Sequence, residues 1–399
     1  MRFADRMQHL RASEIRELLK LTERPEVISF AGGLPAPELF PARELGDILA
    51  ELAHAEGAAT LQYGVTAGYG PLREAIARRM EATDGVRVDA GQVLVTQGSQ
   101  QGLDFAGRIF LDKGSVVLCE SPTYLAAISA FKAYEPRFVA VPTDEEGMLP
   151  GPLADILARE SDIRMVYVIP DFQNPTGRTW SLERRKQLLA LLSGTDIPIV
   201  EDNPYGELRF EGPALAGLQA LDTDGRVIRL GTFSKILCPG LRIGWVSATP
   251  ELIARFDLVK QGADLHTAQL TQACVARYLE RHDIDAHIAV LRDTYRGRRD
   301  AMLGEIEARF GTAVTVNVPH GGLFLWMTLP GGVDARELLV RCLARNVAFV
   351  PGGSFFPDGG HGNTLRLNFS NMPQERIREG IRRMAEAFGT LPGMVRPAS

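Results

Sequence analysis

The feature that most constrains the fold is a repeated alternation between short apolar runs and longer amphipathic runs. The apolar runs have the length of buried strands, and they lie at Val93–Thr96, Ser115–Cys119, Phe138–Val141, Met165–Ile169, Ile197–Val200, Val227–Leu230 and Ile243–Val246. Helical patterns fill the intervals, at Pro71–Met80, Gln100–Leu111, Tyr124–Ala133, Leu182–Leu192 and Glu251–Lys260. Strands that alternate with helices of this length predict an α/β fold with a mostly parallel sheet covered by helices on both faces.

The pattern changes after about residue 262. A long helical stretch is followed by a mixture of strand and helix patterns, at Ala268–Phe310, Gly322–Leu329, Ala335–Arg345, Val347–Val350, Leu365–Phe369 and Pro373–Phe388. This order predicts a smaller α+β unit. The first forty or so residues cannot form a core of their own and are expected to pack on the other units. We therefore predict a large domain over residues 45–285 and a small domain that combines residues 1–44 with residues 286–399.

Charge and composition exclude several classes of protein. The chain has 44 Lys and Arg residues against 49 Asp and Glu residues, and this net charge of −5 argues against a nucleic-acid-binding surface. No apolar run approaches the ~18 residues of a membrane span, and the N-terminus lacks the apolar segment of a secretory signal. The four cysteines form no closely spaced pair, and no zinc-binding HExxH motif or phosphate-binding P-loop occurs. We expect a cytoplasmic protein without a catalytic metal.

Two segments that follow predicted strands have the composition of ligand-binding turns. Gly98, Ser99 and Gln100 lie between a strand and a helix, where free N–H groups and the helix dipole suit a phosphate. The alternative is that Ser99 only caps the helix. Asp202 lies at the carboxyl end of a predicted strand, where open α/β sheets bind ligands. A capping role for Asp202 is the alternative.

A lysine and an arginine carry the most specific chemistry. Lys235 comes just after a buried strand and next to Ser234, and Arg242 follows it. This grouping suits a Schiff-base lysine beside phosphate ligands, whereas the alternative is a lysine that extends to solvent. Arg366 lies within an alternating strand pattern, so its charge needs a buried anionic partner, either an acidic residue of the fold or a substrate carboxylate.

The order and number of the motifs are more informative than any one of them. The motifs are SFAGGLPAPELFP from Ser29, LQYG from Leu61, GSQQ, SPTY, QNPTG, EDNPYGEL, TFSK, GLRIGW and TLRLNFS. Together they resemble the fold-type I aminotransferases that depend on pyridoxal 5′-phosphate. Within that family the chain is similar to the 2-aminoadipate aminotransferase and kynurenine aminotransferase II branch. The segments Ile15–Leu21 and Lys260–Thr267 resemble the bacterial 2-aminoadipate enzyme most closely.

The resemblance implies roles around the cofactor ring. Lys235 would bond to the cofactor aldehyde as a Schiff base and later move the substrate proton. Asp202 would pair with the pyridine nitrogen and so make the ring an electron sink. Tyr205 and Asn174 would bond to the phenolate oxygen, and Tyr124 would stack on the ring.

The resemblance also implies how the phosphate and the substrate are held. Ser99, Gln100, Ser234 and Arg242 would hold the phosphate. Tyr63 would reach the phosphate of a neighbouring subunit, which implies a homodimer with shared active sites.

For the substrate, Arg366 would bind the α-carboxylate, and Gly33 would let the backbone approach closely. Asn174 would lie beside the substrate as well as the cofactor. Arg16 matches a position that contacts a distal carboxylate, although an exposed helical arginine is the alternative.

We therefore expect an aminotransferase that acts by a ping-pong mechanism. It would move the amino group of 2-aminoadipate, glutamate, leucine or an aromatic amino acid to 2-oxoglutarate. One alternative is the same cofactor with another reaction, such as that of a β-lyase, racemase or decarboxylase. A second alternative is a ligand-sensing transcription regulator, but the motifs begin at Ser29 and leave no room here for a DNA-binding segment.

Overall fold

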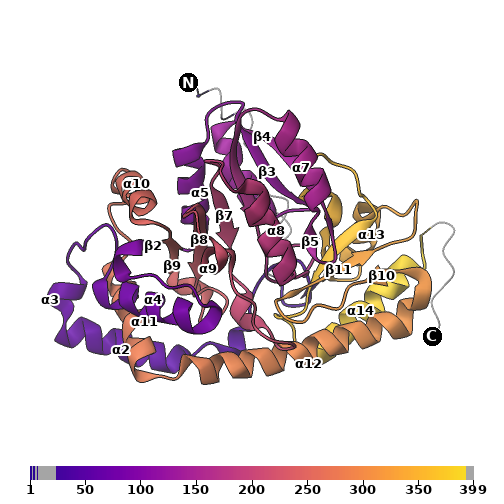
Figure 1. The fold of residues 1–399 in the computed structure, drawn as a ribbon. Coiled ribbons are helices and arrows are strands. Elements are labelled where there is room, and N and C mark those ends of the chain that lie inside the picture. Colours follow the sequence, from indigo (N-terminus) through magenta and orange to yellow (C-terminus); the bar gives the residue numbers. More distant parts are fainter. Residues whose placement is uncertain (2, 5–6, 8–23, 392–399) are drawn as a thin grey trace.

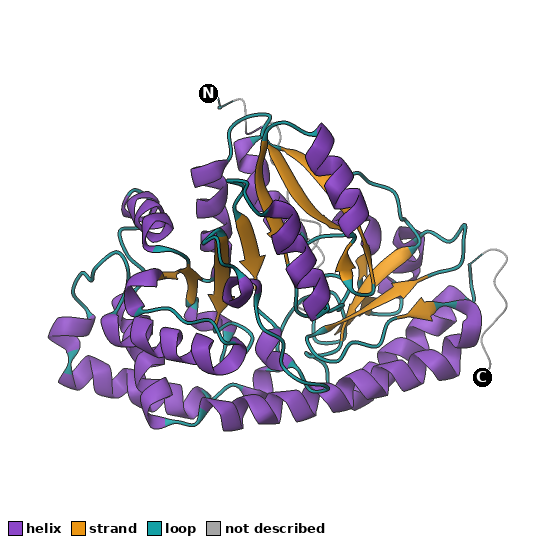
Figure 2. Cartoon of the chain, in the orientation of Figure 1, coloured by secondary structure: helices purple, strands orange, loops and turns teal. Residues whose placement is uncertain are grey.

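The computed structural model describes residues 24–391 together with residues 1, 3–4 and 7. The helices are α2 (Ala42–Ala55), α3 (Gly57–Thr60), α4 (Gly70–Asp84), α5 (Ser99–Phe110), α6 (Leu125–Phe131), α7 (Pro150–Arg159), α8 (Leu182–Leu192), α9 (Leu218–Leu221), α10 (Pro250–Gln261), α11 (Gln269–Arg281), α12 (Ile284–Phe310), α13 (Ala335–Leu343) and α14 (Gln374–Phe388). The strands are β1 (Ile28–Ser29), β2 (Val93–Thr96), β3 (Val116–Ser121), β4 (Arg137–Asp144), β5 (Gly147–Met148), β6 (Ile163–Val168), β7 (Ile199–Asp202), β8 (Val227–Thr232), β9 (Gly244–Ser247), β10 (Thr315–Val316), β11 (Phe324–Thr328), β12 (Val347–Ala348), β13 (Val350–Pro351) and β14 (Thr364–Asn368). Figures 1 and 2 show how they are arranged.

The large sheet has eight strands in the order β2-β9-β8-β7-β6-β3-β4-β5. Strands β8, β7, β6, β3 and β4 are parallel, whereas β9 is antiparallel to both of its neighbours and β5 is antiparallel to β4. The predicted α/β fold with a mostly parallel sheet is confirmed. Because β9 is antiparallel to both β2 and β8, those two strands run in the same direction. Strands β2, β3, β6, β7 and β8 therefore all end at one edge of the sheet.

Both faces of this sheet are buried, as the continuous apolar runs predicted. Alternate residues of a strand point to opposite faces, and they belong to two different hydrophobic clusters. Val117, Met165 and Val200 pack in the cluster that includes residues of α4 and α5, whereas Val116 and Val166 pack with residues of α7 and α8. Helices therefore cover both faces and leave the edges and strand ends for a ligand.

The C-terminal part forms a second sheet. It is antiparallel, in the order β10-β11-β14-β13, and β1 near the start of the described chain pairs with β12. The N-terminal segment thus packs on the C-terminal unit. The predicted strand at Val347–Val350 is divided, because β12 pairs with β1 and β13 with β14.

The predicted helical stretch from Ala268 to Phe310 consists of two helices, α11 and α12. The break has a local cause, since the Asp283 carboxylate accepts bonds from the backbone N–H groups of Asp285 and Ala286 and so starts a new helix. Figure 1 shows α12 along the base of the molecule, from the region of α2 and α11 to that of α14. Among the described residues, no helix is long and apolar enough to cross a membrane.

Candidate active site

A cavity of about 460 Å³ lies where the strands of the large sheet end. Most of the residues that the sequence singled out line it, namely Gly33, Ser99, Gln100, Tyr124, Asn174, Asp202, Tyr205, Ser234, Lys235, Arg242 and Arg366. The topology explains why segments so far apart in sequence meet. Ser99 follows β2, Tyr124 follows β3, Asn174 follows β6, Asp202 ends β7 and Lys235 follows β8. These strands all end at the same edge of the sheet, so the turns after them converge on one place.

Lys235 is half-buried in this cavity. Its Nζ atom donates a hydrogen bond of 2.8 Å to the backbone carbonyl of Gly33. Burial, together with the nearby guanidinium groups of Arg366 and Arg242, lowers the pKa of Lys235 to about 8, although the Asp202 carboxylate acts in the opposite direction. A larger fraction of this amine is therefore neutral near pH 7 than of an exposed lysine, and a neutral amine is nucleophilic. The interpretation that Lys235 extends to solvent does not fit this geometry.

Asp202 is buried and only partly satisfied. The hydroxyl of Tyr167 donates a hydrogen bond of 2.9 Å to Oδ2, whereas Oδ1 has no hydrogen-bond partner among the described residues. Burial raises the pKa of Asp202 to about 6, and the bond from Tyr167 and the charge of Lys235 hold it below a still higher value. A buried acceptor without a donor is costly, so Oδ1 has the properties of a site for a donor on a bound molecule.

Arg366 is fully buried between two aromatic rings. Its guanidinium donates to Asn174 Oδ1 at 2.7 Å and to the carbonyl of Ala31 at 2.6 Å. The centroids of the Phe324 and Phe355 rings lie 4.3 and 5.1 Å from its central carbon. Burial lowers the pKa of Arg366 to about 10. No acidic side chain forms an ion pair with it within the part of the chain that the structure describes, so the first of the two predicted partners, an acid of the fold, is not seen there.

The turn before α5 has the features of an anion-binding site. Gly98 is the residue before the helix, with φ of 71°, and no side chain caps the helix, so Ser99 does not have the capping role that was its alternative. Arg242 donates to the carbonyl of Gln97 at 3.2 Å, and a Cβ atom at position 98 would lie only 2.4 Å from its Nη2 atom. Ser99 and Gln100, in the uncapped first turn of α5, and Arg242 thus line the same cavity, an arrangement that suits a phosphate.

Two predicted residues lie elsewhere. Tyr63 is 79% exposed, and its ring meets the edge of His266 at a centroid distance of 5.7 Å. It does not line the cavity of its own chain. Arg16 lies outside the described residues.

Three aromatic residues of the site were not singled out from the sequence. Tyr167 lies inside a predicted strand, where a buried tyrosine among aliphatic residues must find a partner for its hydroxyl; that is a signal for a polar contact. Phe324 and Phe355, which enclose the Arg366 guanidinium, have no such signal. Their place beside Arg366 follows from the pairing of β11 with β14 and from the turn after β13.

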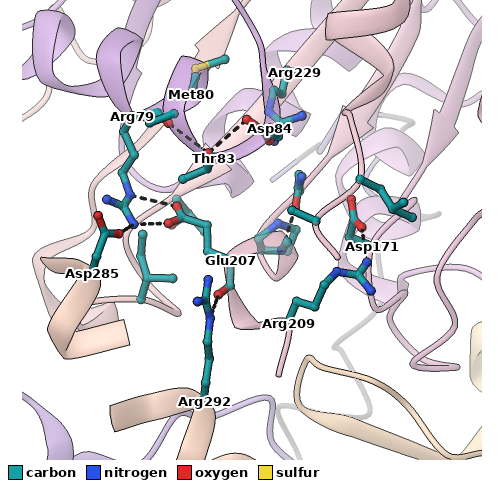
Figure 3. A pocket seen from close by; sticks show the side chains of 18 of the residues that line it. Arg79, Met80, Thr83, Asp84, Asp171, Glu207, Arg209, Arg229, Asp285 and Arg292 are labelled. Carbon is teal, nitrogen blue, oxygen red and sulfur yellow. Dashed lines mark hydrogen bonds and ion pairs between the residues drawn. The ribbon is translucent and has the colours of Figure 1, made fainter. Parts of the chain in front are cut away.

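A second cavity of about 390 Å³ is lined in part by Asn203, Pro204, Gly206 and Glu207, which belong to the loop after β7 (Figure 3). The Glu207 carboxylate forms an ion pair with Arg79 of α4, and the Glu207 carbonyl accepts a bond of 2.7 Å from Arg292 of α12. These contacts fasten the loop to two helices. Sequence analysis did not identify this cluster, because Arg79, Glu207 and Arg292 are distant in sequence and unremarkable as residue types.

The residues around the first cavity fit pyridoxal 5′-phosphate. The unpaired Asp202 Oδ1 is an acceptor for a ring N–H, Lys235 offers an amine for the aldehyde, and the start of α5 with Arg242 offers donors for the phosphate. Among the described residues there is no group of three or more His, Cys, Asp or Glu side chains that could hold a metal ion. The donor set is thus suited to an anionic, ring-containing organic cofactor.

Comparison with known proteins agrees with this chemistry. Residues 40–384 match the family described as aminotransferase class I and II. The chain is 47% identical to aromatic-amino-acid aminotransferase 1 of Thermococcus litoralis, over 97% of this chain and 94% of that protein. It is also similar to the structure of the α-aminoadipate aminotransferase of Thermus thermophilus with N-(5′-phosphopyridoxyl)-L-leucine, with a TM-score of 0.90, 43% identity and 96% of each chain covered.

A third similar protein is the kynurenine aminotransferase of Pyrococcus horikoshii, whose structure contains pyridoxamine phosphate. The TM-score is 0.91 at 43% identity, and 96% of each chain is covered. The resemblance found in the sequence is thereby confirmed. The chain belongs to the class I and II aminotransferases, and it is a transaminase that depends on pyridoxal phosphate.

Proposed function

We propose that this enzyme moves the amino group of an L-amino acid to 2-oxoglutarate in two half-reactions, and that it accepts 2-aminoadipate, glutamate, leucine and aromatic amino acids. The observation that carries the proposal is the grouping of an amine, a partly satisfied carboxylate and a buried guanidinium around one cavity, from Lys235, Asp202 and Arg366. The range of substrates is supported by the names of the similar proteins, which act on aromatic amino acids, aminoadipate and kynurenine, and by the leucine adduct in one of them.

Each residue has a physical task in this proposal. Bound pyridoxal phosphate supplies an aldehyde and an electron-withdrawing ring. Lys235 Nζ takes the proton from the substrate Cα and returns it, because its lowered pKa leaves a larger fraction of the amine neutral than in an exposed lysine. Asp202 Oδ1 accepts the ring N–H and keeps that proton in place. Arg366 orients the substrate by binding its α-carboxylate with two parallel bonds.

The remaining residues hold the cofactor and limit its movement. Ser99, Gln100, Ser234 and Arg242 bind the phosphate, and we name these four residues the phosphate cradle. Tyr205 and Asn174 bond to the ring oxygen, and Tyr124 covers one face of the ring. Gly33 provides a backbone carbonyl to Lys235 and lies close to Phe324, so a side chain at this position would meet the Phe324 ring at about 3.0 Å.

The proposed enzyme is a homodimer in which Tyr63 reaches the partner's phosphate. Leu61, Tyr63 and Val65 are all strongly exposed and lie on one short loop. A concentrated exposed apolar segment of this kind favours a contact with another chain. Sedimentation velocity tests this step: a dimer is expected, and a Tyr63→Phe variant should remain a dimer but release the cofactor faster, since it loses only the hydroxyl. A monomeric wild-type protein would contradict it.

Substrate preference depends on the group that meets the distal end of the substrate side chain. We assign Arg16 to the distal carboxylate of 2-aminoadipate and glutamate. Substitution of Arg16 by Ala should then reduce the rates with these dicarboxylic substrates and leave the rate with leucine unchanged. An equal loss with leucine would mean that Arg16 acts on folding or on the whole site.

The experiment that tests the reaction is a panel of half-reactions. The purified, cofactor-loaded enzyme is mixed with 2-aminoadipate, glutamate, leucine, phenylalanine or kynurenine without an acceptor, and the visible cofactor band is followed. Loss of the band with stoichiometric formation of the 2-oxo acid, and its recovery with 2-oxoglutarate, is expected. Turnover of the amino acid without an acceptor, giving a racemised, cleaved or decarboxylated product, would favour the alternative reactions and refute the transfer.

A further inference from the structure

A fully buried lysine lies outside the active-site cavity, at the end of α10. The Lys260 ammonium donates to both carboxylate oxygens of Asp264, at 2.9 and 3.0 Å, to Gln101 Oε1 at 3.0 Å and to Thr267 Oγ1 at 3.1 Å. Its side chain has no exposed area. Lys260, Asp264 and Thr267 belong to the segment Lys260–Thr267, whose resemblance to the bacterial 2-aminoadipate enzyme was noted in the sequence. The proposed reaction gives this segment no task.

This cluster connects to the phosphate cradle through Gln101. The same Gln101 Oε1 atom accepts the backbone N–H of Gln97 at 2.9 Å, and Gln101 Nε2 donates to Asp264 at 2.8 Å. The backbone carbonyl of Gln97 in turn accepts a hydrogen bond from Arg242. Gln97 is therefore held at its N–H by the Lys260 cluster and at its carbonyl by a member of the phosphate cradle.

The geometry of the turn explains why such support is needed. Gly98 has a positive φ, and its N–H donates to the carbonyl of Thr96 at 2.8 Å, so the chain reverses sharply between β2 and α5. Ser99 and Gln100 line the cavity directly after this turn, so the positions of their N–H groups depend on its shape. A small rotation of the Gln97 peptide would move both these N–H groups and the Arg242 guanidinium.

A buried ion pair adds little to the free energy of unfolding. Removal of two charges from water costs several kcal/mol, and an apolar pair of similar volume commonly does as well. The ammonium instead provides three N–H donors with different directions, here shared among Gln101 of α5 and two residues of the loop between α10 and α11, Asp264 and Thr267. Asp264 neutralises the lysine locally, so the cluster fixes orientation and adds little net charge near the phosphate.

We propose that Lys260 is a positioning residue for the cofactor phosphate: through Gln101 it holds the Gln97–Gly98 turn, so that the N–H groups of Ser99 and Gln100 and the Arg242 guanidinium converge on the phosphate. The inference rests on the proposed phosphate cradle. It assigns to Lys260 no contact with the cofactor and no part in proton transfer.

The test measures binding rather than turnover. Cofactor-free wild-type protein and Lys260→Met are titrated with pyridoxamine 5′-phosphate and, separately, with pyridoxamine, by calorimetry. These probes lack the aldehyde, so Lys235 cannot bond to them and only the non-covalent contacts are measured. We expect the dissociation constant for pyridoxamine 5′-phosphate to rise at least tenfold in Lys260→Met, while that for pyridoxamine changes less than twofold.

Two further variants complete the design. Lys113→Met removes an exposed lysine, 77% accessible, and should change neither constant. Gln101→Met breaks the connection to Gln97 but leaves the bonds of Lys260 to Asp264 and Thr267. It should reproduce the phosphate-specific loss, and it decides the question if Lys260→Met does not fold.

Three outcomes are distinguishable. Equal weakening for both probes in the folded variants, or no weakening in either variant, would overturn the positioning role. A wild-type protein that binds pyridoxamine 5′-phosphate no more tightly than pyridoxamine would instead overturn the phosphate cradle on which the inference rests. A selective loss for the phosphorylated probe in both variants supports the inference.

Discussion

Replacement of Asp202 by Asn should stabilise the cofactor-free protein. In that state the Asp202 carboxylate is buried, and one of its oxygens has no partner among the described residues. Asparagine has nearly the same shape and can still accept the bond from Tyr167, whose hydroxyl lies 2.9 Å from Oδ2. The substitution therefore removes a buried charge and keeps its one hydrogen bond.

The pKa of Asp202 gives the size and the sign of the effect. Burial raises this pKa from 3.8 to about 6 in the folded state. The folded protein then binds the proton more tightly, so this group favours folding below about pH 4, and the contribution is lost as the pH rises through about 6. Each pKa unit corresponds to about 1.4 kcal/mol, so above pH 6 the carboxylate costs the folded state about 3 kcal/mol.

The assay is urea unfolding of the cofactor-free proteins at pH 7.5 and pH 4.5. Asp202→Asn should be more stable by up to about 3 kcal/mol at pH 7.5 and by only about 1 kcal/mol at pH 4.5. Asp171→Asn is the matched control. Asp171 is also buried, but it pairs with Arg185 at 2.8 Å and Arg209 at 3.3 Å, so this substitution should destabilise by ~3–5 kcal/mol.

With pyridoxal phosphate bound the sign should reverse for Asp202→Asn, because an amide cannot pair with a cationic ring N–H as a carboxylate does. A variant that is less stable than the parent without cofactor at pH 7.5, or whose stability difference does not change with pH, would refute the reasoning. It would mean that another group already neutralises the Asp202 charge.

Three further substitutions test other parts of the site. Lys235→Ala should abolish transamination but still bind pyridoxamine 5′-phosphate within a few-fold of wild type by calorimetry, and any retained transamination contradicts the assignment. Arg366→Met should lower kcat/KM for every amino acid at least a hundredfold, which corresponds to a loss of ~3–5 kcal/mol in transition-state stabilisation. Unchanged kinetics would mean that Arg366 has a structural role only. Glu207→Gln should lower stability to urea by ~1–3 kcal/mol, because Arg79 keeps only its pairing with Asp285, whereas the exposed Asp285→Asn should cost less than ~0.5 kcal/mol.

Seven of the eight strands of the large sheet could be predicted because each contains a short apolar run, whereas β5 (Gly147–Met148) has no such run and was not predicted. A strand buried on both faces is apolar at successive positions, so it can be recognised in the sequence. For β2 the predicted bounds, Val93–Thr96, are those of the structure. The direction of β9 could not be predicted in this way. An antiparallel strand buried on both faces has the same apolar composition as a parallel one, and its direction is decided by the short connection from β8 through residues 233–243.

After about residue 262, two elements that the apolar pattern predicted as continuous are each divided in the structure. The division between α11 and α12 depends on one side chain, Asp283, whose carboxylate caps the second helix. The division of the predicted strand at Val347–Val350 depends on partners far away in sequence, since β12 pairs with β1 and β13 with β14. The first difference could be found from capping rules, whereas the second required the tertiary structure.

The candidate site was accessible from the sequence for a topological reason. Residues that follow parallel strands must meet at one edge, so polar residues after several strands are expected together before any contact is known. This argument identifies Ser99, Asp202 and Lys235. The topological argument does not identify Phe324 of β11 or Lys260 of α10. Neither residue follows a parallel strand, so its position in the sequence does not indicate that it lies near the site.

The contacts around Arg366 and Lys260 illustrate two different uses of buried charge. Arg366 is buried without an acidic partner among the described residues, and its bonds go to the neutral oxygens of Asn174 and Ala31, so its charge remains available to a ligand. Lys260 is buried with Asp264, and its charge is satisfied within the fold. A buried cation without an anionic partner lowers the stability of the folded protein, and binding of an anion restores that stability. A buried cation that is already paired holds its neighbours in place whether or not a ligand is bound. The two should therefore respond differently to substrate: a carboxylate ligand should raise the melting temperature of wild-type protein and of Gln101→Met alike, and should fail to do so in Arg366→Met.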